Sequence, residues 1–137
     1  VEDYTIKDAI HLVCGEDTLD LHNNYDFTEI TYSVAERRAT LTWIRSSGDW
    51  VTPTEPLQLQ LEFHGVSCFR FMPRDPEMPF TEDNCLASAG YWTDEDWCEG
   101  VMIFEGDPGP RWLRAFHFQS GATVAIAADE AKAIIRR

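Results

Sequence analysis

Hydrophobic and polar residues alternate most regularly between positions 57 and 71, in the stretch LQLQLEFHGVSCFRF. Three leucines and Phe63 occupy every second position, and polar side chains lie between them. Successive side chains of a β-strand point to opposite faces, so this pattern predicts a strand with one buried and one solvated face. Gly65 interrupts the alternation. We therefore expect residues 66–71 to form a second strand, or to continue the first strand past a bulge.

The same period of two recurs on both sides of this stretch. Residues 30–34 and 39–43 alternate around a short polar connection and predict a hairpin. Residues 112–118 carry apolar groups on both faces, which is typical of a central strand or of one covered by two layers. Two more segments, 100–105 and 123–127, are also predicted to be strands.

Helical periodicity is confined to the two ends of the chain. At the end, residues 129–137 place acids first and arginines last, which suits the dipole of a helix, and Ala131, Ile134 and Ile135 would form its apolar side. Near the beginning, residues 5–13 place four apolar residues on one helical stripe, and a strand is the alternative. Another turn or two of helix fits residues 82–89.

Together these elements predict an α+β fold that consists mainly of antiparallel β-structure. We expect a sandwich or a half-rolled sheet of six to seven strands, with a C-terminal helix and a short N-terminal helix. A chain of 137 residues is long enough to bury one sizeable core, so we expect one domain over residues 1–137. No apolar run approaches the length that crosses a bilayer, and we expect a soluble protein with no membrane partner.

The formal net charge of −13 limits the partners of such a protein. Phosphate backbones are repelled by an acidic surface, so we expect no binding to nucleic acid. A basic protein would be attracted instead, and faster at low salt. The charge is concentrated between positions 73 and 107, where ten acidic residues accompany one base, Arg74. The alternative is that this charge has no binding function and only keeps the protein soluble.

Three prolines follow residue 72, and about 25 residues then lack a clear period, which is longer than an ordinary connection. Aromatic residues that fill pockets anchor many interfaces, and carboxylates around them would steer a basic partner. We therefore predict that this loop binds a partner. The alternative is that its tryptophans fold inward over the sheet, and we expect at least one of them to do so. With Trp50 from another loop, the candidate residues are Trp50, Asp75, Glu77, Glu82, Asp83, Tyr91, Trp92, Asp94, Glu95, Asp96, Trp97 and Glu99.

Motifs for catalysis or metal binding are weak. The four cysteines contain no C-x-x-C pair, and we expect them to be reduced in a cytoplasmic protein, with Cys68 a small buried hydrophobe. The histidines lack metal-ligand spacing, although His64 and His117 lie on predicted strands and would form a site if they met a carboxylate such as Glu62. The acids at 82–83 and 94–99 lack the pattern of a calcium loop. We expect no cofactor and no metal.

One resemblance supplements these patterns. The segment FTEITYSVAERRATLTW, followed by LQLQLEFHGVSCFRF, resembles small bacterial proteins with an acid-x-I-x-Y strand, a return strand and an L-x-L-x-F-x-G-V strand. Several such families resemble immunity proteins, which are small acidic cytoplasmic domains that block a partner toxin. The resemblance covers residues 27–71 and implies a binding role without assigning any functional residue.

Two functions follow as hypotheses. The first is a non-enzymatic protein-binding module, immunity-like, that meets a basic partner through the acidic aromatic loop. The alternative is a small-molecule-binding protein or an enzyme with its site inside the curved sheet. That site would be lined by rings such as Phe63, Phe71, Trp112 and Phe116.

Overall fold

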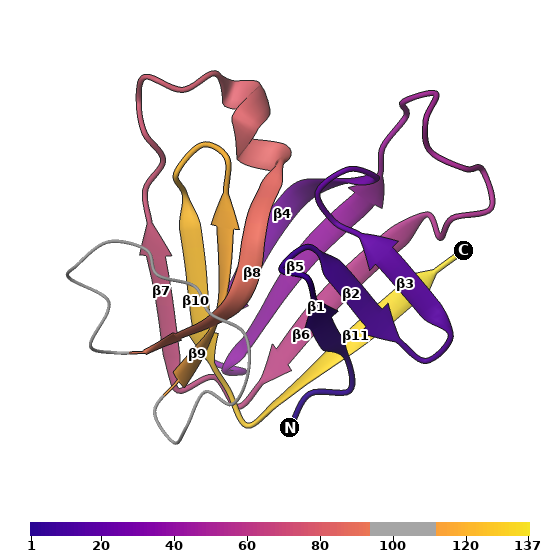
Figure 1. Ribbon diagram of the computed structural model, residues 1–137. Helices are drawn as coiled ribbons and strands as arrows, with labels where there is room; N and C mark the ends of the chain where they lie inside the picture. Colours follow the sequence, from indigo (N-terminus) through magenta and orange to yellow (C-terminus); the bar gives the residue numbers. More distant parts are fainter. Residues whose placement is uncertain (94–111) are drawn as a thin grey trace.

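The computed structural model describes residues 1–93 and 112–137, and in them the chain consists almost entirely of antiparallel β-strands (Figure 1). The N-terminal sheet contains β1 (Thr5–Lys7), β2 (His11–Cys14) and β3 (Asp17–Asp20). The first large sheet has the order β11 (Glu130–Arg136), β6 (Gln58–His64), β5 (Arg38–Arg45) and β4 (Tyr25–Ser33). The second large sheet has the order β7 (Cys68–Met72), β10 (Thr123–Ala127), β9 (Trp112–Phe118) and β8 (Leu86–Thr93). A short 3₁₀ helix, η1 (Phe80–Asn84), precedes β8.

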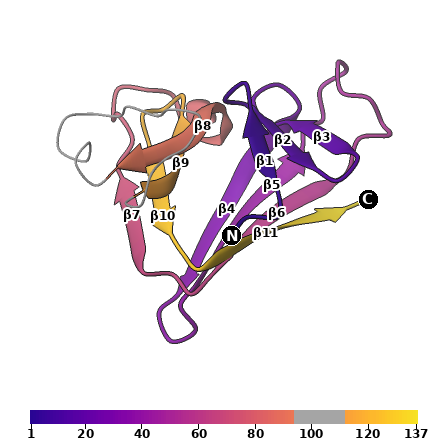
Figure 2. The same ribbon diagram turned by 60° about the horizontal axis from the view of Figure 1, so that its bottom comes forward.

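The two large sheets share one bent ribbon. β6 pairs with β11 in the first large sheet, and β7, which follows β6, pairs with β10 in the second. Hydrogen bonds continue across the bend, where the Asp129 amide donates to the His64 carbonyl at 3.0 Å and the Ser67 amide donates to the Ala127 carbonyl at 2.8 Å. β5 extends the ribbon from β6, whereas β9 extends it from β10. The sheets therefore diverge from a common corner, as Figure 2 shows.

Gly65 makes this corner sharp. Its φ of +69° lies in the left-handed region, which residues with a Cβ rarely adopt. A Cβ at this position would also lie 2.1 Å from Oδ2 of Asp129, which belongs to the other strand of the ribbon. The predicted interruption at Gly65 is thus a bend between two strands of different sheets, rather than a bulge within one.

The core lies between the three sheets. Leu59, Leu61 and Phe63 are buried, as their alternation predicted, and they belong to one hydrophobic cluster with residues of the N-terminal sheet and of the second large sheet. A smaller cluster of Trp92, Leu113, Ala115 and Ala125 is buried on the other face of the second large sheet. β9 therefore has apolar groups on both faces and lies between β10 and β8, which confirms the prediction of a central strand.

The predicted hairpin is also confirmed, with Ile30 opposite Leu41 in β4 and β5. So is the strand at Thr123–Ala127. Residues 82–89 contain the end of η1 and then the start of β8, so helix covers only part of that segment. The strand predicted at 100–105 lies outside the described residues.

The prediction of a C-terminal helix is wrong, because residues 130–136 form strand β11. β11 pairs with β6 from Glu130 opposite His64 to Arg136 opposite Gln58. The apolar residues at 131, 133 and 135 also fit a period of two, and they pack at the core. Without β11, one edge of β6 would keep unpaired backbone groups, and long-range pairing overrides the local helical pattern.

The predictions of an N-terminal helix and of a sandwich or half-rolled sheet are wrong as well. Residues 5–13 form β1 and β2, joined by a turn in which Asp8 and Ala9 have positive φ angles of 53° and 64°. The described residues contain eleven strands in three sheets, instead of six to seven strands in a sandwich or a half-rolled sheet. The α+β class is therefore replaced by an almost all-β fold. Within the described residues, no helix is long and apolar enough to span a membrane.

We predict that Gly65→Ala destabilises the protein more than Gly15→Ala. Both glycines have positive φ, but a Cβ at Gly15 would meet nothing within 4 Å. Gly15→Ala should reduce the free energy of unfolding by about 1–2 kcal/mol through backbone strain alone. Gly65→Ala should cost about 0.5–1.5 kcal/mol more, because the exposed Asp129 side chain has to turn away from the new methyl group. Urea unfolding measures both values, and equal losses would contradict the tight corner.

Candidate functional site

The divergence of the large sheets leaves a gap on each side of the shared ribbon. On one side, β11 of the first large sheet lies opposite the edge of the second large sheet that contains β8. On the other side, β4 lies opposite β7, and Figure 2 shows both sheets opening away from the corner. The two gaps are closed to different extents, and this difference defines the candidate site.

The N-terminal segment fills the gap beside β11. Glu2 forms a parallel bridge with Ala131, and the Asp3 amide donates a hydrogen bond to the Ala131 carbonyl at 3.2 Å. The Asp3 carboxylate in turn accepts a hydrogen bond of 2.8 Å from the Ala133 amide. Among the described residues, a void lined by Glu2, Arg114 and Ala131 among others measures about 10 Å³. That volume holds no more than about one water molecule.

A buried ion pair fastens this segment to the second large sheet. Arg114 of β9 is only 3% exposed, and its guanidinium donates two hydrogen bonds to the Glu2 carboxylate, from Nε at 2.7 Å and from Nη2 at 2.5 Å. The hydroxyl of Tyr4 donates to the same carboxylate at 3.0 Å, and that of Tyr91 donates to it at 3.1 Å. Paired charges with this many hydrogen bonds are tolerated in a protein interior.

The three groups that surround the Glu2 carboxylate keep their protons near neutral pH. Burial raises the pKa of the Tyr4 and Tyr91 hydroxyls, so both stay neutral. Burial alone would lower the pKa of Arg114, but its hydrogen bonds with Glu2, together with the charge interactions with Glu2, Tyr4 and Tyr91, outweigh that effect and the pKa is raised. A group that neither gains nor loses a proton near neutral pH does not serve as an acid or a base. The network is therefore a structural clamp.

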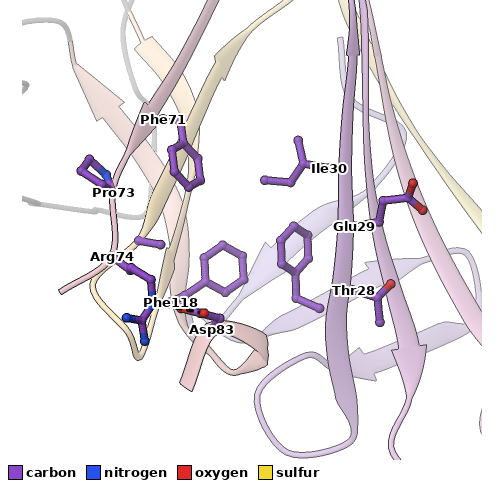
Figure 3. Close-up of a pocket in the computed structure, with 10 residues that line it drawn as sticks. Thr28, Glu29, Ile30, Phe71, Pro73, Arg74, Asp83 and Phe118 are labelled. Carbon is purple, nitrogen blue, oxygen red and sulfur yellow. Dashed lines mark hydrogen bonds and ion pairs between the residues drawn. The ribbon is translucent and has the colours of Figure 1, made fainter. Parts of the chain in front are cut away.

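The gap between β4 and β7 is open. It contains a cavity of about 420 Å³ whose lining is mainly apolar. Phe27 and Ile30 come from β4, Phe71 from β7 and Phe118 from β9. Figure 3 shows Ile30 and Phe71 facing one another across the cavity. The lining is completed by Thr28, Glu29, Pro73, Arg74, Asp83 and Ala122.

A β-bulge in β4 builds one wall of this cavity. The register between β4 and β5 shifts between Phe27 and Glu29, and the extra residue, Thr28, donates its hydroxyl to the Thr42 carbonyl at 3.2 Å. In a regular strand, residues 27 and 30 would point to opposite faces. The bulge puts Phe27 and Ile30 on the same face, whereas Figure 3 shows the Glu29 carboxylate directed away from the cavity.

Two contacts between elements limit the cavity. Toward the corner, the rings of Tyr32 and Phe69 stack with their centroids 4.8 Å apart and join β4 to β7. Elsewhere along its lining, Arg74 donates from Nε to the Asp83 carboxylate at 2.8 and 3.1 Å, and from Nη2 to the Met78 carbonyl at 2.6 Å. Hydrogen bonding to Arg74 lowers the pKa of Asp83, so both groups are charged and neutralise one another.

The predicted partner-binding residues are dispersed where the structure describes them. Trp92 is fully buried, as we expected of at least one tryptophan, and Tyr91 belongs to the clamp. Trp50 is 68% exposed in a different loop, where its indole N–H donates to the Asn23 carbonyl at 2.7 Å. Asp75, Glu77, Glu82 and Asp83 share the segment between β7 and β8, and only Asp83 lines the cavity. Asp94, Glu95, Asp96, Trp97 and Glu99 lie outside the described residues.

The histidines on strands have separate partners. His64 lies 3.1 Å from Glu62 of its own strand, and His117 lies 2.9 Å from the Thr123 hydroxyl. Burial lowers the pKa of His117 and favours its neutral form. In the described part of the chain, no three histidine, cysteine or acidic side chains are grouped so that they could hold a metal ion.

Cys85 and His22 form the remaining pair of reactive side chains. The Cys85 sulfur lies 3.5 Å from Nδ1 of His22, but that nitrogen is only 2.5 Å from the Leu86 carbonyl and donates to it. Burial and the nearby acids raise the pKa of the Cys85 thiol, which disfavours a nucleophilic thiolate. Cys14, Cys68 and Cys85 are all free, and Cys68 packs on the smaller hydrophobic cluster.

Of the rings expected inside a curved sheet, only Phe71 lines the cavity. Phe63 and Phe116 are packed in the core, and Trp112 borders the gap that the N-terminal segment fills. The pattern did not identify Phe27, Ile30 or Phe118 as cavity residues. The bulge signal for Phe27 is its spacing of three from Ile30, which breaks the alternation of the strand.

No protein-family model, curated protein or solved structure matches the chain. Its function is therefore argued from the site itself.

We predict that Glu2→Gln destabilises the protein by about 3–5 kcal/mol, because it leaves the buried Arg114 charge unpaired. The double variant Glu2→Gln/Arg114→Met should recover part of this loss. Glu130→Gln is the matched control, because it breaks an ion pair with Lys132 that is about half exposed, and it should cost less than about 1 kcal/mol. Urea unfolding compares the three, and a loss for Glu2→Gln no greater than the control would contradict a clamp.

Proposed function

We propose that this protein binds a small, largely apolar molecule in the cavity between β4 and β7. The observation that carries the proposal is the unequal closure of the two gaps. The chain fills one gap with its own N-terminal segment, and it leaves the other as an open cavity of about 420 Å³. Cavities of about 300–1,000 Å³ with apolar walls are typical of small-molecule sites.

The chemistry of the walls supports such a ligand. Phe71 is 52% exposed although it belongs to a strand of the second large sheet, and Phe27, Ile30 and Phe118 extend the apolar surface into the cavity. A ligand that covers these side chains removes their surface from water, which is the main driving force of apolar binding. β-Bulges next to binding sites commonly redirect side chains, as the bulge at Thr28 does here.

We propose binding without catalysis. The two charged groups whose side chains meet at the cavity, Arg74 and Asp83, are engaged with one another. A general base or a nucleophile needs an available electron pair at the substrate, and a general acid needs an available proton. Three free cysteines fit a reducing compartment, and we propose a cytoplasmic location on that ground.

A second candidate function is recognition of a basic protein, as in an immunity protein. The observation that favours it is the segment between β7 and η1, where Asp75 and Glu77 are exposed and Phe80 is 81% exposed. Carboxylates around an exposed aromatic ring suit a cationic surface with an apolar anchor. In this account the acids provide steering, and Phe80 provides the contact.

We predict saturable binding of the uncharged fluorescent probe N-phenyl-1-naphthylamine at one site. Ile30→Trp should weaken it by about tenfold or more, because the larger side chain fills the cavity; tenfold corresponds to about 1.4 kcal/mol. Val34→Trp, at the exposed end of the same hairpin, adds the same indole outside the cavity and should leave the affinity unchanged. Fluorescence titration measures the affinity of the unaltered protein and of each variant for the probe. Absence of saturable binding, or equal affinity in both variants, would overturn the proposal.

For the second candidate, we predict that a basic protein retained from the native host at low salt is released at high salt. Asp75→Asn/Glu77→Gln/Phe80→Ala should abolish its retention, and Trp50→Ala, which removes an exposed ring elsewhere, should not. Quantitative affinity capture with the three proteins makes the comparison. Equal retention by all of them would show that this segment is not the interface.

A further inference from the structure

We infer that the cavity between β4 and β7 selects an uncharged or cationic aromatic compound and discriminates against an anionic one. This inference rests on the proposed function and specifies the class of its ligand. It follows from three features of the cavity: the rings in its walls, the engagement of its one base, and the charge that surrounds it.

The walls favour an aromatic ligand. Three of the lining side chains are phenylalanines, and the rings of Phe27 and Phe118 already stack with their centroids 4.5 Å apart. Figure 3 shows Phe71 across the cavity from Ile30, and its side chain is 52% exposed, so it has surface left for a ligand to cover. Aromatic pairs in offset or edge-to-face geometry gain about 0.5–1.5 kcal/mol beyond the area that they bury.

The cationic group at the cavity is already occupied. Among the described lining residues, Arg74 is the one base, and the Asp83 carboxylate and the Met78 carbonyl both accept hydrogen bonds from it. The Phe80 ring also packs on the guanidinium, 4.7 Å from ring centroid to Cζ. A ligand anion would share the guanidinium with the Asp83 carboxylate, which already offsets its positive charge, so the anion gains less there than at an unpaired arginine.

The surroundings repel an anion further. The segment from Asp75 to Asp83, which includes the lining residue Asp83, contributes four acids. Arg70 of β7 alternates with Phe69 and Phe71, so its Cα–Cβ bond points to the opposite face of the sheet from the cavity. The net charge of −13 for the chain adds a long-range repulsion of anions and an attraction of cations.

A matched pair of probes tests this selectivity. N-phenyl-1-naphthylamine and 1-anilinonaphthalene-8-sulfonate share an anilinonaphthalene body, and the second adds a sulfonate. The uncharged probe should bind at least about tenfold more tightly in low salt, and the ratio should shrink as salt screens the surrounding carboxylates. This comparison uses the unaltered protein, so it does not depend on the folding of any variant.

Two variants separate the release of Arg74 from a general change of charge. Asp83→Asn frees the guanidinium and should raise the affinity for the sulfonate probe several-fold, while the affinity for the uncharged probe stays the same. Glu77→Gln removes one negative charge from an exposed position and should change the sulfonate affinity much less. Equal effects of the two variants would contradict the role given to the Arg74–Asp83 pair.

The outcomes distinguish the two proposals. If the uncharged probe does not bind, the proposed function fails. If it binds with the predicted sensitivity to Ile30→Trp, but the sulfonate probe binds as tightly or more tightly to the unaltered protein, the function stands and the charge selectivity is overturned.

Discussion

The bend of the shared ribbon at Gly65 is the constraint on which the rest of the structure depends. One strand of the ribbon runs from β6 into β7, and the other runs from β10 into β11. The two large sheets are therefore joined at one corner and diverge from it. Their inner faces then enclose the core, and the edges on either side cannot pair with one another. Both the clamp and the cavity are consequences of that geometry (Figure 2).

The two gaps contain different kinds of side chain. Beside β11, a carboxylate and a guanidinium are buried together with two phenolic hydroxyls, and the space is filled. Beside β4, apolar side chains line a space that is left open, and the charges of Arg74 and Asp83 are paired with one another. A protein that needed only stability could close both sides. The open side is therefore the part of the fold that requires a functional explanation.

The sequence predicted strands well where the period of two was strong. β6 and the hairpin of β4 and β5 were expected because one-sided burial leaves a clear alternation, and β9 and β10 were expected from short apolar runs bounded by turn residues. β11 was missed because Ala131, Ile134 and Ile135 also fit a helix, and only its pairing with β6 decides the matter. The candidate site was less predictable. The acidic aromatic segment stands out in the sequence, whereas the cavity depends on a bulge at Thr28 and on contacts between β4, β7 and β9 that local periodicity does not contain.

If the space between Ile30 and Phe71 is a ligand site, a crystal structure of the protein with N-phenyl-1-naphthylamine will locate the probe there. We expect the aromatic rings of the probe to lie between these two side chains and to contact Phe118, while the Glu2–Arg114 clamp on the other side stays in place. A probe bound elsewhere on the molecule, with the cavity between β4 and β7 filled only by water, would contradict it.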